Sequence, residues 1–296
     1  MSYWTDLLIK SYHGVTWPFR SMVLRKMQQN ASVPITILFY HRVANENPNP
    51  WTISEGDFET QISWMQDNFD MISLDEAQRR IKTGNSTPSI AITFDDGYSE
   101  NCSFAIPMLL ERRIPLTYFV TTYHTTHNKP FPHDIERGQP LAPNSIESLR
   151  TLVNAGIEIG AHTRTHLNLG ECFDKDVLYD EVIAATRELE SMPDFSIRYF
   201  AFPFGQTTNL NPYVFELLRE HGFSGVCSAY GGLNEIHGDA FHLQRIHGDP
   251  NFIRMKNWLG MEPRWFNVAR YDWKTELQSI PTPSTETNKS LQETGA

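Results

Sequence analysis

Cysteine is scarce in this chain of 296 residues, which has only Cys102, Cys172 and Cys227. Three thiols do not make a disulfide framework, and none is paired at metal-binding spacing. The chain also lacks an apolar run near the roughly 20 residues that a membrane-spanning helix needs. Residues 1–10 have neither the basic nor the apolar region of a secretory signal peptide. We therefore expect a cytoplasmic protein.

An excess of basic residues is missing as well. Lysine and arginine number 25 against 35 aspartates and glutamates, and the formal net charge is −10. Nucleic-acid binders usually carry a basic surface, so a nucleic-acid partner is not expected. A neutral or amino-bearing substrate fits this charge more easily, but we favour the simpler interpretation that the acidic surface serves solubility. Hydrophobic residues make up 40% of the chain, which indicates that most of it folds around a core.

The N-terminal segment 1–30 mixes large apolar side chains with four basic ones, Lys10, Arg20, Arg25 and Lys26. This mixture predicts a helical, amphipathic extension. We favour packing of the extension on its own domain. The alternative is a position on a bilayer surface, which would make the protein peripheral to the inner face of the membrane.

The rest of the chain divides into a folded part and a tail. Residues 31–274 contain the strand and helix patterns and are expected to form one domain. From residue 275 onward, Pro281 and Pro283 lie among serines, threonines and other polar residues with few apolar ones. This composition predicts a disordered tail over 275–296.

Strand and helix patterns alternate along the domain. Short apolar runs predict strands at 35–39, 90–94, 116–120, 157–159, 199–202, 225–227 and 243–247. Helical spacing predicts helices between them, including one that starts at Asn211 and Pro212 and one capped by Asn144 with Glu147. Repeated β-then-α units predict a parallel sheet covered by helices, either flat or closed into a barrel. In both forms, functional groups lie where strands end.

Two polar motifs fall at such ends. Thr93-Phe94-Asp95-Asp96-Gly97 closes the second strand, and His162-Thr163-Arg164-Thr165-His166 follows the fourth. Histidines four apart on a helical turn face the same way and can share a metal. Each motif alone is compatible with an ordinary turn or with surface histidines. We expect the two strands to be neighbours, so that the motifs together supply two imidazoles, one carboxylate ligand and one spare carboxylate.

The pair of motifs resembles the polysaccharide deacetylase family, also called the NodB homology domain or carbohydrate esterase family 4. The similarity extends roughly over residues 35–247. It implies an α/β fold, a distorted (β/α) barrel with about seven parallel strands. It also implies that the chain removes the N-acetyl group of a sugar in a polysaccharide or its precursor.

The resemblance also implies roles for the motif residues. Asp95 corresponds to the general base, and the metal ligands correspond to Asp96, His162 and His166. Mixed nitrogen and oxygen ligands favour Zn²⁺, with Co²⁺, Ni²⁺ and Mn²⁺ as alternatives. The expected substrate is an N-acetylated glycan or a lipid-linked or nucleotide sugar precursor.

A third motif, Phe202-Pro203-Phe204-Gly205, resembles the family segment whose backbone N–H binds the oxyanion, here the amide of Phe204. The family has an arginine before the proline that braces the catalytic aspartate, and Ala201 stands in its place. Arg245, Arg42 and Arg164 are candidate replacements, and the sequence does not choose among them.

The remaining assignments are looser. His247, in the last strand, is the expected general acid, with His242 in reserve. The substrate-groove candidates are His41, Arg42, Pro203 and Arg245, and we prefer His41 to His133 in the proline-rich insert. Two other functions stay open: a non-catalytic glycan-binding module on a decayed fold, given the missing arginine, and an esterase or amidase acting on an O-acetyl ester or a cyclic amide.

Overall fold

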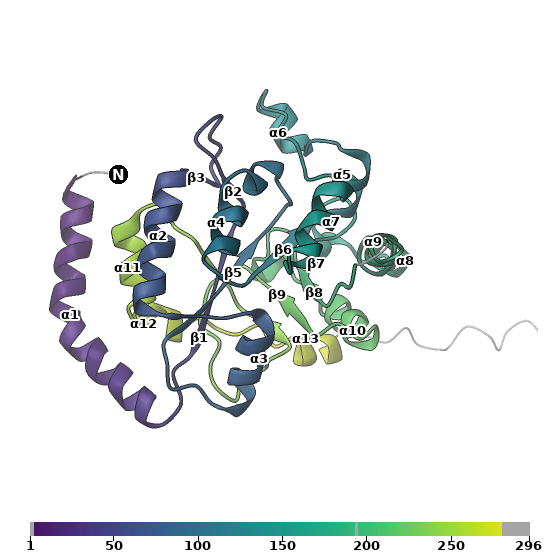
Figure 1. The fold of residues 1–296 in the computed structure, drawn as a ribbon. Helices are drawn as coiled ribbons and strands as arrows, with labels where there is room; N and C mark the ends of the chain where they lie inside the picture. Colours follow the sequence, from purple (N-terminus) through teal and green to yellow (C-terminus); the bar gives the residue numbers. More distant parts are fainter. Residues whose placement is uncertain (1–2, 193–194, 280–296) are drawn as a thin grey trace, which may run out of the picture.

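The computed structural model describes residues 3–192 and 195–279 of the chain (Figure 1). Its centre is a nine-stranded sheet in which every pair of neighbouring strands is parallel. The strands are β1 (Ile35–Tyr40), β4 (Asp70–Met71), β5 (Ser89–Phe94), β6 (Leu116–Val120), β7 (Glu158–Ala161), β8 (Tyr199–Ala201), β9 (Gly225–Cys227), β10 (His242–Leu243) and β11 (Ile246–His247). A separate short pair joins β2 (Arg42–Val43) to β3 (Thr52–Ile53).

The sheet curls into a distorted barrel, as the family resemblance predicts. Its strand order is β10-β9-β8-β7-β6-β5-β1-β11, with β4 beside β5. The two end strands, β10 and β11, are consecutive in the chain, so one segment starts against β9 and finishes against β1. Our single strand at 243–247 is therefore wrong. The segment breaks at Gln244 and Arg245 because it changes partner as it closes the barrel.

Helices surround the sheet. They are α1 (Tyr3–Gln29), α2 (Glu55–Asn68), α3 (Leu74–Thr83), α4 (Ala105–Glu111), α5 (Thr122–His127), α6 (Pro132–Glu136), α7 (Ile146–Asn154), α8 (Lys175–Tyr179), α9 (Ala185–Glu190), α10 (Pro212–Glu220), α11 (Phe252–Leu259), α12 (Pro263–Phe266) and α13 (Trp273–Ser279). A π-helical turn, η3 (Asp180–Ala184), joins α8 to α9. The expected long irregular insert after β6 contains α5 and α6. In the part of the chain described here, none of the helices has the length and apolar character to cross a membrane.

Side-chain caps explain where several helices begin. Asn211 caps α10 and is followed by Pro212, as predicted, and its Oδ1 accepts the N–H of Tyr213 at 3.0 Å. The expected cap of α7 is wrong by one residue. Ser145 holds that position, and Asn144 instead turns inward, where its amide donates to the Tyr118 hydroxyl at 2.6 Å.

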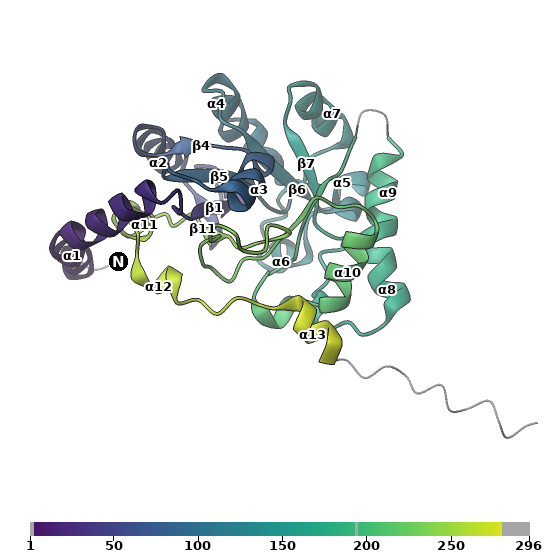
Figure 2. The same ribbon diagram turned by 90° about the horizontal axis from the view of Figure 1, so that it is seen from below.

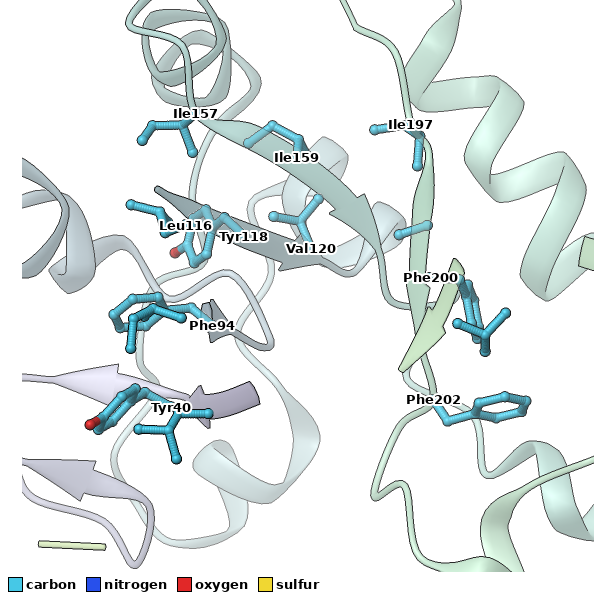
Figure 3. Close-up of a cluster of buried hydrophobic side chains, with 14 of the residues drawn as sticks. Tyr40, Phe94, Leu116, Tyr118, Val120, Ile157, Ile159, Ile197, Phe200 and Phe202 are labelled. Carbon is cyan, nitrogen blue, oxygen red and sulfur yellow. The ribbon is translucent and has the colours of Figure 1, made fainter. Parts of the chain in front are cut away.

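The strands separate two hydrophobic clusters because successive side chains point to opposite faces. The outer cluster lies between the sheet and the helices. Figure 3 shows part of this cluster and labels ten of its residues: Tyr40, Phe94, Leu116, Tyr118, Val120, Ile157, Ile159, Ile197, Phe200 and Phe202. The inner cluster contains the alternate residues of the same strands, among them Ile37, Ala91 and Phe119. Helix α3 adds Leu74, Ala77 and Ile81 to the inner cluster and so closes the end of the barrel where the strands begin.

Helices at both ends of the chain pack against this barrel (Figure 2). In the N-terminal segment, Arg20 of α1 is buried and donates to Glu262 at 2.9 Å. At the other end, α13 occupies residues 275–279, so a disordered tail starting at 275 is wrong. Trp273 is buried and stacks on Phe215 of α10, with ring centroids 5.6 Å apart, which fixes this helix. The remaining tail, 280–296, lies outside the described residues.

Candidate active site

Asp95 and Asp96 lie immediately after β5, at the end of the barrel where the strands finish. Asp96 has a φ of 69° and Gly97 a φ of 82°, so the chain turns sharply there. A Cβ on Gly97 would lie 3.1 Å from a methyl carbon of Val120 on the neighbouring strand β6. The positive φ therefore favours glycine at this position, and a larger residue would also require Val120 to shift by a few tenths of an ångström. The turn directs the two adjacent carboxylates to different partners.

Asp95 is held by Arg245. The guanidinium donates from Nη1 to Oδ1 at 2.7 Å and from Nη2 to Oδ2 at 2.8 Å, and both side chains are buried. Arg245 also donates to the carbonyl of Ser228 at 3.0 Å and the hydroxyl of Thr93 at 3.1 Å. Burial opposes the charge on Asp95, but Arg245 keeps the pKa of this carboxyl below its usual value.

Asp96, His162 and His166 converge on one point. Oδ1 of Asp96 lies 3.4 Å from Nε2 of His162 and 3.3 Å from Nε2 of His166. One ligand atom from each of the three residues lies within 4.8 Å of the others. Oδ1 is buried and makes no hydrogen bond to the described residues. A buried carboxylate oxygen facing two imidazole nitrogens is a suitable set of donors for a divalent cation.

The surroundings fix the two imidazoles in this arrangement. Nδ1 of His162 lies 2.8 Å from the carbonyl of Ala201 on β8. A carbonyl oxygen can only accept a hydrogen bond, so Nδ1 must carry the proton. The other nitrogen, Nε2, then has a free lone pair, which points toward Asp96. His166 has ring contacts with Phe204 and Phe131 at 4.9 and 5.6 Å between centroids. The pKa of Asp96 is well below its usual value, because the two histidines outweigh the opposing effect of burial.

Two features of the histidine motif differ from our expectations. Its strand, β7, is separated from β5 by β6, so the two motifs do not end neighbouring strands. The segment 162–166 is also not helical, because Thr163 and His166 have φ values of 62° and 65°.

A residue that the sequence did not reveal, Glu181, supports this loop. Its Oε2 accepts the backbone N–H groups of Arg164 and Thr165 at 3.0 and 2.9 Å, and its Oε1 accepts the Thr165 hydroxyl at 2.7 Å. Glu181 is buried in the π-helical turn η3. Such turns shift the register of a helix and occur frequently at functional sites. The only sequence signal is an acidic residue within an otherwise apolar helical stripe.

The third motif forms a tight turn after β8. Phe204 and Gly205 have φ values of 61° and 62°, and the N–H of Gly205 donates to the carbonyl of Pro203 at 2.6 Å. Within residues 3–192 and 195–279, the N–H of Phe204 has no hydrogen-bond acceptor. The Phe204 ring is 57% exposed, beside His166. Pro203 is itself buried, so it shapes the turn and does not line a groove.

His247 and His41 lie together at the end of β1. Their ring centroids are 5.9 Å apart, and both rings contact Phe39. Burial, helped by the neighbouring His41, lowers the pKa of His247 to about 4. Burial also lowers the pKa of His41. Asn101 positions His41 by donating to its carbonyl at 2.7 Å. Both imidazoles are therefore neutral at neutral pH.

Other sequence candidates lie elsewhere. Arg42 is buried and donates to Glu100 at 3.0 Å and to two loop carbonyls, so it is not a groove residue. Arg245 is likewise buried and braces Asp95, so it does not line a groove either. Arg164 pairs with Asp180 and Glu188.

The two remaining histidine candidates also differ in position. The ring of His242 is buried and contacts Phe215 and Tyr230, and its Nε2 lies 2.9 Å from the Ser228 hydroxyl. His133 on α6 lies nearer the cluster. Its ring centroid is 6.2 Å from that of His166 and 5.5 Å from that of Trp51.

The fold is a parallel β/α barrel, and Asp96, His162 and His166 lie at the carboxyl ends of its strands. Enzymes with parallel β/α barrels carry their active sites at this end of the barrel. The sequence profile of the family described as Polysaccharide deacetylase matches residues 82–226. A chitooligosaccharide deacetylase from Bradyrhizobium sp. (strain ANU 289) is 30% identical over 138 residues, which cover 46% of this chain and 55% of that protein. The chain spans about half the length of the curated relatives it matches.

Solved structures share the fold. Deacetylase PplD from Streptococcus pyogenes, in complex with acetate, superposes with a TM-score of 0.63 and 20% identity, over 76% of this chain and 96% of that one. IcaB from Ammonifex degensii gives a TM-score of 0.62 and 22% identity, over 77% and 97%. Over residues 82–226 the chain is thus similar in sequence to the polysaccharide deacetylase family. The matched segment includes Asp95, Asp96, His162 and His166, whereas Arg245 and His247 lie beyond it.

Proposed function

We propose that the chain hydrolyses the N-acetyl group of an N-acetylated sugar, in a polysaccharide or its biosynthetic precursor, with the help of a divalent metal ion. The observation that carries this proposal is the convergence of Asp96, His162 and His166 beside a separate, braced carboxylate, Asp95. Three protein ligands and a nearby base are what metal-assisted hydrolysis requires.

Asp96, His162 and His166 would hold the ion through one oxygen and two nitrogen atoms. This set favours Zn²⁺, with Co²⁺, Ni²⁺ and Mn²⁺ as alternatives. When bound, such an ion polarises the acetamide carbonyl and lowers the pKa of water to about 7. The buried carbonyl of Ala201 and the carboxylate of Glu181 keep the two histidines in place for this purpose.

The other groups act directly on the substrate. Asp95, kept ionised by Arg245, accepts the proton of the attacking water. The N–H of Phe204 donates a hydrogen bond to the oxygen that becomes negative during the attack. His247 transfers a proton to the departing amine. Because its pKa is lowered to about 4, His247 is neutral at rest, so the proton that Asp95 takes from the water must pass to His247 before it reaches the departing amine.

The hypothesis of a non-catalytic module rested on two grounds: the uncertain general acid, and Ala201, which stands where the family has an arginine. The position of Arg245 bears on the second of these grounds. Arg245, which lies between β10 and β11, makes a bidentate contact with Asp95. We further propose that the substrate is an exopolysaccharide or its lipid-linked precursor, since the acidic chain accommodates an amino-bearing product.

The decisive experiment is acetate release from a panel of N-acetylated glycans, O-acetylated glycans and small cyclic amides. The panel is run with the metal-loaded protein and again after chelation. We expect release from the N-acetylated glycans alone, lost with chelator and restored by Zn²⁺. Release from the O-acetyl esters alone would identify an esterase, and glycan binding without acetate release at any metal concentration would identify a binding module.

A further inference from the structure

Helix α1 exposes an unusual amount of apolar surface. Leu8, Val15, Phe19 and Met22 are 70%, 82%, 62% and 60% exposed. Their spacing of seven, four and three residues places them on one face of the helix. Eight of the large apolar side chains exposed in the described part of the chain are on α1: Trp4, Leu7, Leu8, Tyr12, Val15, Trp17, Phe19 and Met22. Clusters of this kind on a soluble fold mark an interaction surface.

The fold does not need these side chains, because the opposite face of α1 makes the contacts with the domain. Arg20 is buried and donates to the carbonyls of Asn257 and Gly260 at 3.0 and 3.2 Å, next to α11. Asp6 accepts from Asn251 at 3.0 Å. Figures 1 and 2 show α1 at the periphery of the molecule, beside α11.

A cavity of about 300 Å³ lies on the inner side of α1. Trp17, Leu24, Trp64 and Trp258 are among the residues that line it. The inner face of α1 therefore also carries apolar side chains. Packing against the domain explains these inner side chains, but it does not explain the apolar side chains on the outer face.

The charge on α1 is opposite to that of the rest of the protein. Residues 1–30 contain four basic side chains and a single acidic one, in a chain whose formal net charge is −10. Arg25 and Lys26 are exposed on or beside the apolar face, and Lys10 is exposed elsewhere on the helix, whereas Asp6 is engaged by Asn251. The outward side of α1 thus combines apolar side chains with positive charge and presents no exposed carboxylate of its own.

We propose that α1 lies on the surface of a bilayer that contains anionic lipids, with Leu8, Val15, Phe19 and Met22 inserted among the acyl chains. Amphipathic helices with basic flanks bind membranes in this way. Arg25 and Lys26 then meet lipid phosphates. A second copy of the chain fits this face less well. Pairing two α1 helices would bring their lysines and arginines together without acidic side chains on the helix face to neutralise them.

The test is co-sedimentation of the full chain with vesicles of phosphatidylcholine and of phosphatidylcholine mixed with phosphatidylglycerol. We expect binding to the mixed vesicles that weakens as salt is added. The double variant Val15→Asp/Phe19→Asp should reduce this binding at least about tenfold, because each buried apolar side chain is worth about that factor. Arg25→Glu/Lys26→Glu should reduce binding to the mixed vesicles and leave binding to neutral ones unchanged.

The matched control is Phe173→Asp, which changes an apolar side chain that is 87% exposed outside α1 and should leave vesicle binding unaltered. Circular dichroism and acetate release from a short soluble substrate should be the same for all variants, which separates this proposal from the catalytic one. Failure of the wild-type chain to bind the mixed vesicles would overturn the proposal. So would a concentration-dependent dimer, without vesicle binding, that Val15→Asp/Phe19→Asp dissociates.

Discussion

Arg245 and Asp95 form a buried, bidentate ion pair, with N–O distances of 2.7 and 2.8 Å. The two residues are 150 positions apart in the sequence, and the pair forms because the segment between β10 and β11 passes beside the end of β5 as it closes the barrel. The guanidinium also lies 4.9 and 5.3 Å from the ring centroids of Phe39 and Phe119. The segment that closes the barrel therefore also supplies the arginine that keeps Asp95, the proposed base, ionised.

Replacing Arg245 with methionine should affect both stability and the pH dependence of catalysis. Removing one partner of a buried ion pair costs about 3–5 kcal/mol of unfolding free energy. Burial alone raises the pKa of Asp95, and in the wild type Arg245 overrides that effect. In Arg245→Met the acid limb of kcat/KM should therefore move to higher pH. Urea unfolding and pH–rate profiles measure the two effects.

Arg42→Met is the matched control. Arg42 is also buried and paired, but with Glu100. Its loss should destabilise the chain without moving the acid limb. If Arg245→Met is too unstable to assay, Arg245→Lys keeps the charge and loses the bidentate geometry, and a smaller shift in the same direction is expected. An unchanged acid limb in Arg245→Lys and Arg245→Met would show that Asp95 is not the base.

Asp95 and Asp96 should separate catalysis from metal binding, although they are adjacent. Asp95→Asn should lower kcat about 10²–10⁴-fold, the usual contribution of a general base, and still bind metal. Asp96→Asn and His162→Ala should lose metal and activity together. Metal content after dialysis and acetate release give the two readouts. Near-normal turnover by Asp95→Asn, or a fully active metal-free His162→Ala, contradicts the assignment.

The positions of the motifs could be predicted from the sequence because each follows an apolar strand. Asp95, His162 and Phe204 all come directly after such a run, and the ends of parallel strands meet at one face of a barrel. Six of the seven predicted strands match strands of the barrel, and the seventh, 243–247, is divided into β10 and β11. The order in space follows from the barrel alternative, since the strand at 116–120 comes between the two motif strands in the sequence, and our expectation that the motif strands are neighbours overlooked it.

The supporting contacts were beyond sequence reasoning. Arg245 was one of three candidate arginines, and its direction depends on the break between β10 and β11, where strand alternation is lost. Glu181 lies in a stretch whose spacing predicts an ordinary helix. Only the π-helical turn brings its carboxylate to the backbone of Arg164 and Thr165. Both contacts join segments whose approach is decided by tertiary packing.

Glu181→Gln should weaken metal binding without abolishing the fold. The glutamine keeps one acceptor oxygen, so it cannot accept both backbone N–H groups and the Thr165 hydroxyl as Glu181 does. Loss of a group that orients metal ligands typically lowers affinity 10–100-fold. Calorimetric titration with Zn²⁺ measures this change, and excess metal should restore turnover. Glu188→Gln, which alters only a side-chain contact of Arg164, should leave affinity unchanged.

His247 and His41 can be distinguished as proton donors by single substitutions. His247→Ala should lower kcat about 10²–10⁴-fold if its ring protonates the departing amine. His41→Ala should mainly raise KM, because His41 lies beside His247 and is only partly exposed. A substrate with an activated leaving group needs less protonation, so it should recover much of the loss in His247→Ala. The reverse pattern would assign the proton transfer to His41.

His242 should make the stability of the domain fall on acidification. Burial, reinforced by the charge of Arg270, lowers its pKa from 6.5 to about 3, despite the opposing effect of Asp239. The unfolded chain therefore binds a proton below pH about 6.5 that the folded chain does not bind until about pH 3. His242 should therefore leave the unfolding free energy unchanged above pH 6.5 and decrease it below that pH by up to about 1.4 kcal/mol per pH unit, in addition to the decrease caused by His41 and His247.

In His242→Gln this proton uptake by the unfolded chain is absent. The variant should be less stable than the wild type at pH 7, because it weakens the buried contact with the Ser228 hydroxyl. The difference should shrink as the pH falls. Urea unfolding of the metal-free protein between pH 7 and 5 measures this, since protonation of His162 and His166 would add metal loss to the slope. His127→Gln, at an exposed ring, is the control, and a parallel slope for His242→Gln would show that His242 does not cause the decrease.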